Sequence, residues 1–243
     1  MRRPSLALIV LFAMFGGIVT PSELRAAPPE DSPSARPVRI VGFGDSITKG
    51  VRPGVTAEQT FVAMLEKRLR DRKIPAEVIN LGVGSERTDL ALKRFDQVLA
   101  QSPTHVLIMY GANDSYVDPD KTQPRVLIED FKKNLIEMIE RLRAEGIEPI
   151  LMTEPRVAAG ARNGVGEDPN VWLAKFMEVC REVAQAHGVD LVDNYAVWSA
   201  AERDGVDLNT WTTDRVHPNA IGHAKITDAI ERVLVKKLAD EKE

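Results

Sequence analysis

The chain has 243 residues, of which 44% are hydrophobic and 28% charged, so it can bury a sizeable core and is neither collagen-like nor disordered. Its formal net charge of −4, without a basic run, argues against nucleic acid or an anionic membrane as the main partner. The single cysteine, Cys180, excludes an intramolecular disulfide framework.

The first 26 residues are typical of a secretory signal peptide. Arg2 and Arg3 precede a mostly apolar run from Leu6 to Val19, which is too short to span a bilayer comfortably but suits a signal peptide. Ala26–Ala27 offers a small-residue cleavage site, and an uncleaved membrane anchor is the alternative. We therefore predict export to the periplasm or the extracellular space, with no stable membrane partner after cleavage.

Residues 27–37 are rich in proline and predict a linker, and strands and helices then alternate along a single domain, 38–243. Short runs of β-branched and apolar residues predict five strands, at Val38–Gly42, Ala76–Asn80, His105–Tyr110, Glu148–Thr153 and Asp190–Val192. Apolar stripes at helical spacing lie between them, the longest over Pro124–Glu145. This alternation predicts a three-layer α/β/α fold whose five-stranded parallel sheet has the flavodoxin-like order 2-1-3-4-5.

Two polar segments fall where such a sheet binds ligands. Ligands lie beyond the carboxyl ends of the strands, in the crevice where the strand order reverses between strands one and three. Gly42–Thr48 overlaps and follows strand one, and Gly111–Asp114 follows strand three. Ser46 is a small nucleophile that needs a base, and Asn113 is a carboxamide donor suited to an oxyanion. Together they predict an acyl-transfer site.

The base that Ser46 needs is offered near the C-terminus by Asp214-Arg215-Val216-His217-Pro218. Pro218 suits the first position of a following helix, which would place His217 at a helix entrance with Asp214 one turn upstream. Asp214 can then accept the Nδ1–H of the imidazole, leaving Nε2 to take the serine proton.

Four segments, in order along the chain, resemble the signature blocks of the SGNH hydrolases, also called GDSL esterases and lipases. They are Gly44-Asp45-Ser46-Ile47, Asn80-Leu81-Gly82-Val83-Gly84-Ser85, Gly111-Ala112-Asn113-Asp114 and Asp214-Arg215-Val216-His217-Pro218. The resemblance implies that Ser46 attacks the ester, that His217 is the general base and then the general acid, and that Asp214 orients it.

The same resemblance implies three donors to the oxyanion: the Ser46 main-chain N–H, the Asn113 side chain and an N–H of the second block. The family usually has glycine at the second-block donor. The preferred alignment places Ser85 at this position in this chain, with Gly84 just before it. A main-chain N–H donates whatever its side chain, and the sequence leaves open which of the two residues donates.

Other chemistry has weaker support. Ile47 occupies the third glycine position of a dinucleotide fingerprint that would begin at Gly42, and the four histidines show no metal-binding pair at helical spacing. We therefore predict neither cofactor nor metal. Trp211, three residues before Asp214, either lines the cleft or simply packs.

The sequence thus predicts a serine ester hydrolase that acts on small-molecule or carbohydrate esters, with small acyl groups such as acetyl as the leading substrates. A lysophospholipase or thioesterase acting on longer acyl chains is the enzymatic alternative. A non-catalytic binding protein on the same fold is an alternative of another class. The oligomeric state is left open.

Overall fold

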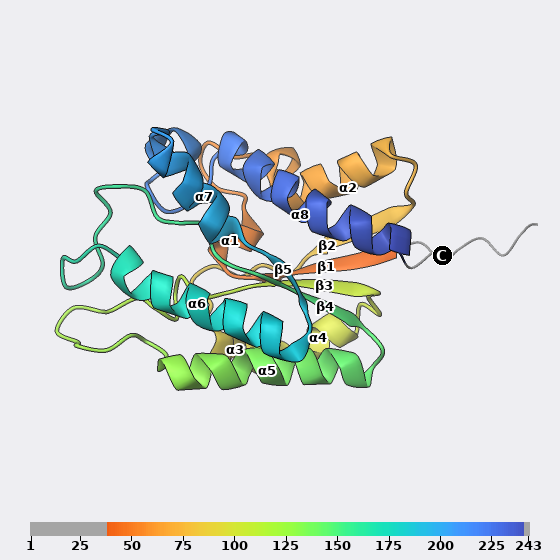
Figure 1. The fold of residues 1–243 in the computed structure, drawn as a ribbon, viewed down its shortest axis with the longest axis horizontal. Helices are drawn as coiled ribbons and strands as arrows, with labels where there is room; N and C mark the ends of the chain where they lie inside the picture. Colours follow the sequence, from red (N-terminus) through yellow and green to blue (C-terminus); the bar gives the residue numbers. More distant parts are fainter. Residues whose placement is uncertain (1–37, 241–243) are drawn as a thin grey trace, which may run out of the picture. The chain divides into compact units, whose positions relative to one another are not determined.

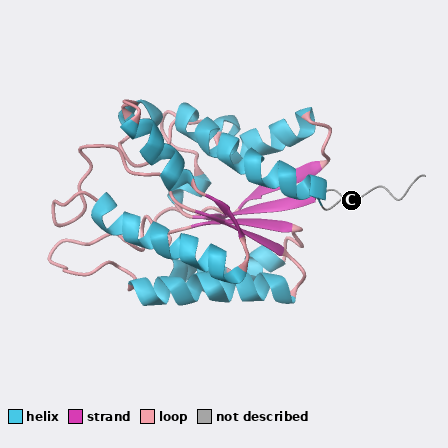
Figure 2. Ribbon diagram, viewed as in Figure 1, coloured by secondary structure: helices cyan, strands magenta, loops and turns pink. Residues whose placement is uncertain are grey.

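The computed structural model describes residues 38–240, so the predicted signal peptide (1–26) and linker (27–37) lie outside the described residues. Five strands form one parallel sheet in the order β2-β1-β3-β4-β5. Helices cover both faces of this sheet (Figures 1 and 2). The predicted fold class and strand order are confirmed. In the described part of the chain, no helix is both long and apolar enough to cross a membrane.

The strands lie close to their predicted positions. They are β1 (Val38–Gly44), β2 (Ala76–Asn80), β3 (His105–Met109), β4 (Glu148–Met152) and β5 (Asp190–Val192). β3 lies in the centre of the sheet with every residue buried, because helices cover both of its faces. Its alternate side chains therefore enter different cores: Val106 and Ile108 on one face, Leu107 and Met109 on the other.

Each face of the sheet is covered by its own helices (Figure 1). One face carries α1 (Ser46–Lys49), α2 (Phe61–Asp71) and α8 (Ala220–Asp240). The other face carries α3 (Thr88–Ala91), α4 (Asp96–Leu99), α5 (Ile128–Ala144) and α6 (Asn170–His187). A further helix, α7 (Asn194–Arg203), follows β5, and the short 3₁₀ turns are η1 (Ala57–Gln59), η2 (Leu92–Arg94) and η3 (Leu208–Trp211).

The long helix α5 begins later than its apolar stripe predicts. The sequence places its start at Pro124, whereas the structure places it at Ile128. The main-chain N–H of Arg125 donates to the carbonyl of Tyr116 (3.0 Å), and that of Val126 donates to the carbonyl of Asp114 (3.1 Å). This segment therefore pairs with the loop after β3, and that pairing fixes the shape of the loop beside Asn113.

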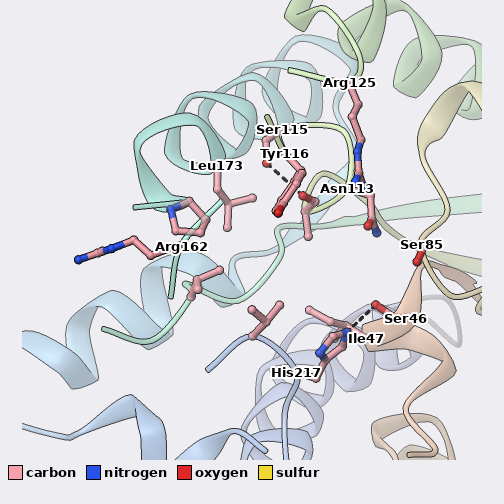
Figure 3. A pocket seen from close by; sticks show the side chains of 14 residues that line it. Ser46, Ile47, Ser85, Asn113, Ser115, Tyr116, Arg125, Arg162, Leu173 and His217 are labelled. Atoms are coloured by element: carbon pink, nitrogen blue, oxygen red, sulfur yellow. Dashed lines mark hydrogen bonds between the residues drawn. The ribbon is translucent and has the colours of Figure 1, made fainter. Parts of the chain in front are cut away.

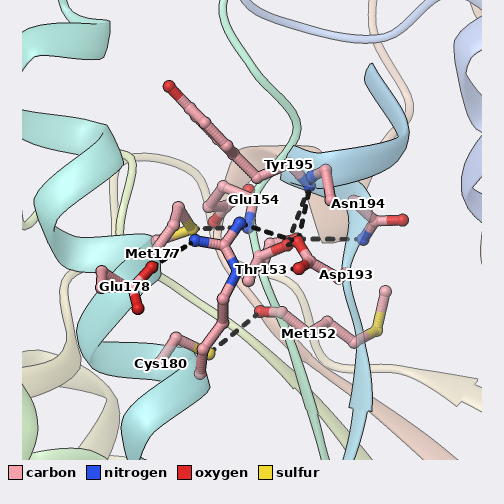
Figure 4. A network of polar contacts seen from close by, with 11 residues as sticks. Met152, Thr153, Glu154, Met177, Glu178, Cys180, Asp193, Asn194 and Tyr195 are labelled. Carbon is pink, nitrogen blue, oxygen red and sulfur yellow. Dashed lines mark hydrogen bonds and ion pairs between the residues drawn. The ribbon is translucent and has the colours of Figure 1, made fainter. Parts of the chain in front are cut away.

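A partly buried carboxylate, Asp193, joins the ends of β4 and β5 to α6 and α7 (Figure 4). It caps α7 by accepting from Ala196 N (3.0 Å), and it also accepts from Thr153 Oγ1 (2.9 Å) and from Arg181 Nε (2.7 Å) and Nη2 (3.1 Å). Burial acts to raise the pKa of Asp193, but these hydrogen bonds outweigh it and hold the pKa below its ordinary value.

We expect Asp193→Ala to lower the free energy of unfolding by about 1–3 kcal/mol, because it removes a helix cap and leaves Arg181 unpaired. Since the folded-state pKa of Asp193 is depressed, its stabilisation is present above the unfolded-state pKa and is lost as the pH falls through the folded-state pKa. Urea unfolding at neutral pH and at about pH 3 measures both effects. The control is Asp204→Ala, which removes an exposed carboxylate at the other end of α7. Equal losses of unfolding free energy in Asp193→Ala and Asp204→Ala would contradict this stabilising role of Asp193.

Candidate active site

The predicted nucleophile, Ser46, lies on a tight turn between β1 and α1. The Asp45 side chain caps α1 by accepting from Ile47 N (2.9 Å), and Ser46 is the first residue of the helix. A Cβ at Gly44 would lie 2.1 Å from Thr48 Oγ1 and 2.6 Å from the Met109 carbonyl. Only glycine therefore lets β1 run this close to β3 and α1, and the turn presents Ser46 at the carboxyl edge of the sheet.

The predicted base, His217, lies on a second turn, which the Asp214 side chain closes. Its Oδ1 accepts from His217 N (2.8 Å) and Val216 N (3.2 Å). Arg215 takes a left-handed conformation (φ +76°) within the turn, and its carbonyl accepts from Ala158 N (2.8 Å) in the loop after β4. The turn is therefore fixed from inside and from a neighbouring loop.

The predicted helix entrance at Pro218 is wrong. α8 begins at Ala220, and Asn219 caps it by accepting from Ile221 N (2.9 Å) and Gly222 N (3.1 Å). Pro218 instead pairs with Thr212 in an isolated β-bridge. His217 is held by its own turn and lies before the helix.

The two turns bring Ser46, His217 and Asp214 into one chain of hydrogen bonds (Figure 3 shows the first of them). Ser46 Oγ lies 2.9 Å from His217 Nε2, and His217 Nδ1 lies 2.9 Å from Asp214 Oδ2. Burial lowers the pKa of His217 and outweighs the opposing effect of Asp214. The pKa of Asp214 lies below its ordinary value, because hydrogen bonds from His217 and Val216 overcome partial burial. A neutral imidazole beside an ionised carboxylate can accept a proton from the serine.

Three of the four predicted oxyanion residues, Ser46, Ser85 and Asn113, line one pocket. Asn113 follows β3, and its Nδ2 donates to Asp45 Oδ2 (2.7 Å). Because a carboxamide carries two hydrogens, this bond orients the amide and leaves the second hydrogen for the pocket. Burial raises the pKa of Asp45 well above its ordinary value, and the hydrogen bonds from Ile47 and Asn113 oppose this effect.

The structure distinguishes the two candidates for the second-block donor. Ser85 lines the pocket and has a left-handed backbone (φ +60°), a conformation that favours glycine. Gly84 does not have a positive φ and is not among the residues that line the pocket. The family's usual glycine thus fits the backbone of Ser85 better than that of Gly84, so the geometry favours Ser85 as the donor.

Ser46 opens onto a pocket of about 270 Å³ (Figure 3). One part of its wall is apolar and consists of Ile47, Ala112, Val157, Pro169, Leu173 and Val216. The remaining lining residues carry polar or charged groups and are Ser46, Ser85, Asn113, Ser115, Tyr116, Arg125, Arg162 and His217. Trp211 lies outside this lining and packs edge-to-face on Trp198, with ring centroids 5.2 Å apart.

Sequence reasoning missed two partners of the predicted residues. Asp45 orients the amide of Asn113, and Arg52 Nη2 donates to Asp214 Oδ2 (2.6 Å). Arg52 lies far from Asp214 in the sequence, so no local pattern could reveal the contact. Within residues 38–240, no group of three or more histidine, cysteine or acidic side chains is arranged to hold a metal ion.

Comparison with known proteins assigns the family. Residues 43–225 match the GDSL-like lipase/acylhydrolase family. The chain belongs to this family. A relative from Bos taurus, the isoamyl acetate-hydrolyzing esterase 1 homolog, is 26% identical over 83% of this chain and 83% of its own length. Membership in the family makes the chain a carboxylic ester hydrolase of the GDSL type, as the sequence predicts.

Solved structures of GDSL-type enzymes share the fold. The lipase/acylhydrolase from Enterococcus faecalis is 28% identical, with a TM-score of 0.68 over 80% of this chain and 94% of that one. The acetyl xylan esterase AlAXEase is 26% identical, with a TM-score of 0.64 over 80% of this chain and 98% of its own.

Two glycines of the GDSL-type site provide a matched pair of variants. We expect Gly44→Ala to reduce kcat/KM for an ester about 100-fold, because the new Cβ forces the Ser46 turn away from β3. The Cβ added by Gly84→Ala would have no heavy atom within 4 Å, so this variant should keep kcat/KM within about threefold of the wild type. Ester hydrolysis gives both values, and circular dichroism shows that each variant is folded. A fully active Gly44→Ala enzyme would show that the turn tolerates a side chain.

Proposed function

We propose that this GDSL-type enzyme is an exported esterase that removes small acyl groups, above all acetyl, from carbohydrates through an acyl-serine intermediate. The observation that carries the proposal is the chain of hydrogen bonds from Ser46 through His217 to Asp214, at the wall of a pocket. Asn113 and Ser85 lie on the same pocket, where the oxyanion needs its donors.

The geometry supports a two-step reaction. Ser46 Oγ bonds to the carbonyl carbon as its proton passes to His217 Nε2, and the carbonyl oxygen becomes an oxyanion. The Asn113 amide and the main-chain N–H groups of Ser46 and Ser85 then stabilise this charge. Collapse breaks the ester bond, and His217 returns its proton to the departing alcohol. Water then attacks the acyl-serine with His217 again as base, which releases the acid and restores Ser46.

Two features support acetyl esters of carbohydrates. The relatives at 26% identity carry the names of an isoamyl acetate-hydrolyzing esterase homolog and an acetyl xylan esterase, whose substrates share an acetyl group. The pocket, at about 270 Å³, lies near the lower end of the range for small-molecule sites, about 300–1,000 Å³. Its Ser115, Tyr116 and Arg162 side chains offer hydrogen bonds to a hydroxyl-rich alcohol.

One observation favours the alternative of a longer acyl chain. Ile47, Val157, Leu173 and Val216 are apolar residues that line the same pocket as Ser46 and His217, and they offer a surface for methylene groups. Acyl chain length is therefore the property that separates the two substrate classes.

Hydrolysis of p-nitrophenyl esters from acetyl to long acyl, by the wild type and by Ser46→Ala, tests the proposal. We expect kcat/KM to be highest for acetyl and the variant to lose more than about 1,000-fold, because it lacks the nucleophile. Acetylated xylo-oligosaccharides then serve as the carbohydrate substrate. A Ser46-dependent maximum at long chains would indicate a lysophospholipase or thioesterase, and activity retained in Ser46→Ala would contradict the nucleophile.

A fluorophosphonate probe separates an enzyme of narrow specificity from a binding protein. An activated Ser46 is labelled in the wild type and not in Ser46→Ala, whereas an unactivated serine stays unmodified in both. Export, which rests on the pattern of residues 1–26, is tested by the N-terminal sequence of the secreted chain. A mature N-terminus near residue 27 supports cleavage, and the intact N-terminus on a membrane-bound chain indicates an anchor.

A further inference from the structure

A tight turn after α1 delivers an arginine to the back of the Asp214–His217 pair. Arg52 and Val55 exchange main-chain hydrogen bonds (3.3 and 2.9 Å), with Pro53 and Gly54 between them. Gly54 has a φ of +87°, which suits the third position of a type II turn. A Cβ at Gly54 would lie 3.9 Å from Thr213 Cγ2, so the turn packs beside the residue that precedes Asp214.

Arg52 contacts the Asp214 oxygen that lies nearer to His217 Nδ1; the other oxygen, Oδ1, lies 3.1 Å from the same nitrogen. Arg52 Nη2 lies 2.6 Å from Asp214 Oδ2, and the same Oδ2 lies 2.9 Å from His217 Nδ1. Oδ1 is engaged by main-chain N–H groups of the turn. Both oxygens of Asp214 are thus held, although 40% of its side chain is exposed to solvent and could otherwise rotate.

We propose that Arg52 is a positioning residue of the hydrolytic reaction: it fixes the Asp214 carboxylate for His217 and places a positive charge behind the pair. The inference rests on the proposed function of Ser46, His217 and Asp214. Arg52 does not line the substrate pocket, so it acts through Asp214 and not on the ester.

The charges around His217 are consistent with this role. Burial lowers the pKa of His217 most, Asp214 opposes it, and the positive charge of Arg52 lowers it further. The other arginines near the pocket are engaged elsewhere, since Arg125 pairs with Asp118 (2.6 Å) and Arg215 donates to the Gly160 carbonyl (3.2 Å).

Two further ionisable groups of the site are hydrogen-bonded to other partners. Arg162 donates to its neighbouring Ala161 carbonyl (3.1 Å), and Asp45 is buried next to Ser46 with a pKa raised to about 7. Among the groups at the site, Arg52 is therefore the cation that contacts the Asp214–His217 pair directly.

The effect of Arg52 on catalysis can be measured separately from its effect on the stability of the fold. A partly exposed ion pair contributes little to folding, so Arg52→Met, which keeps an unbranched aliphatic side chain and removes the charged guanidinium group, should fold normally. Arg52→Lys keeps the charge. The matched control is Arg70→Met. Arg70 forms a partly exposed ion pair with Glu66, and both residues lie on α2, away from the site.

The experiment is the pH profile of kcat and KM on p-nitrophenyl acetate for these variants. For Arg52→Met we expect the acid limb of kcat/KM to move to higher pH, because His217 then remains protonated up to a higher pH. We also expect kcat on the plateau to fall about 10-fold or more, because Asp214 no longer holds His217 in place as firmly. KM should not change. Arg52→Lys should keep the acid limb near that of the wild type, and Arg70→Met should match the wild type throughout.

An NMR titration of the His217 imidazole in the wild type and in Arg52→Met needs no turnover. A higher His217 pKa in Arg52→Met supports the proposal even if the wild type hydrolyses none of the esters, in which case only the proposed function fails. An unchanged His217 pKa and an unchanged kcat in a folded Arg52→Met protein would overturn the role of Arg52.

Discussion

The parallel pairing of β1 with β3 is the contact on which the site depends. Gly44 lies opposite Met109 in this register, so the segments that follow, with Ser46 and Asn113, leave the sheet side by side. The approach is so close that no side chain fits at Gly44. Strands buried on both faces give a rigid base from which loops can hold reacting groups in fixed positions. The predicted nucleophile and a predicted oxyanion donor are brought together in this way by the sheet itself.

The same close packing buries acidic groups beneath the site. Asp45, Asp114 and Glu154 are all fully buried, and burial raises the pKa of each. Asp45 is hydrogen-bonded to Asn113 and to the start of α1, whereas both carboxyl oxygens of Glu154 lack a hydrogen-bond partner within the described residues. A buried carboxyl group without such partners is most stable in its neutral form. Asp45 is therefore the one of the three that directly orients the predicted catalytic groups.

The Asp214–His217 turn depends on contacts from three directions. Its own carboxylate closes it, Arg215 ties it to the loop after β4, and Arg52 ties it to the segment that follows the nucleophile. Each tie is a hydrogen bond of ordinary length, and together they restrict a solvent-exposed loop that would otherwise move. The base is thus positioned by the same part of the chain that carries Ser46.

The sequence by itself determined the strands, the order of the sheet and the four segments that carry Ser46, Asn113, Asp214 and His217. The strands follow from periodicity, and the sheet order follows from the common topology of such alternating chains. The four segments follow from the residues after the strands, from the local Asp214–His217 spacing and from the resemblance to the SGNH hydrolases. The tertiary structure alone decided the late start of α5, the packing of Trp211, the left-handed backbone of Ser85 and the partners Asp45 and Arg52. Each of these depends on a local backbone conformation or on contacts between distant segments, and such contacts form only when the loops pack together on the finished sheet.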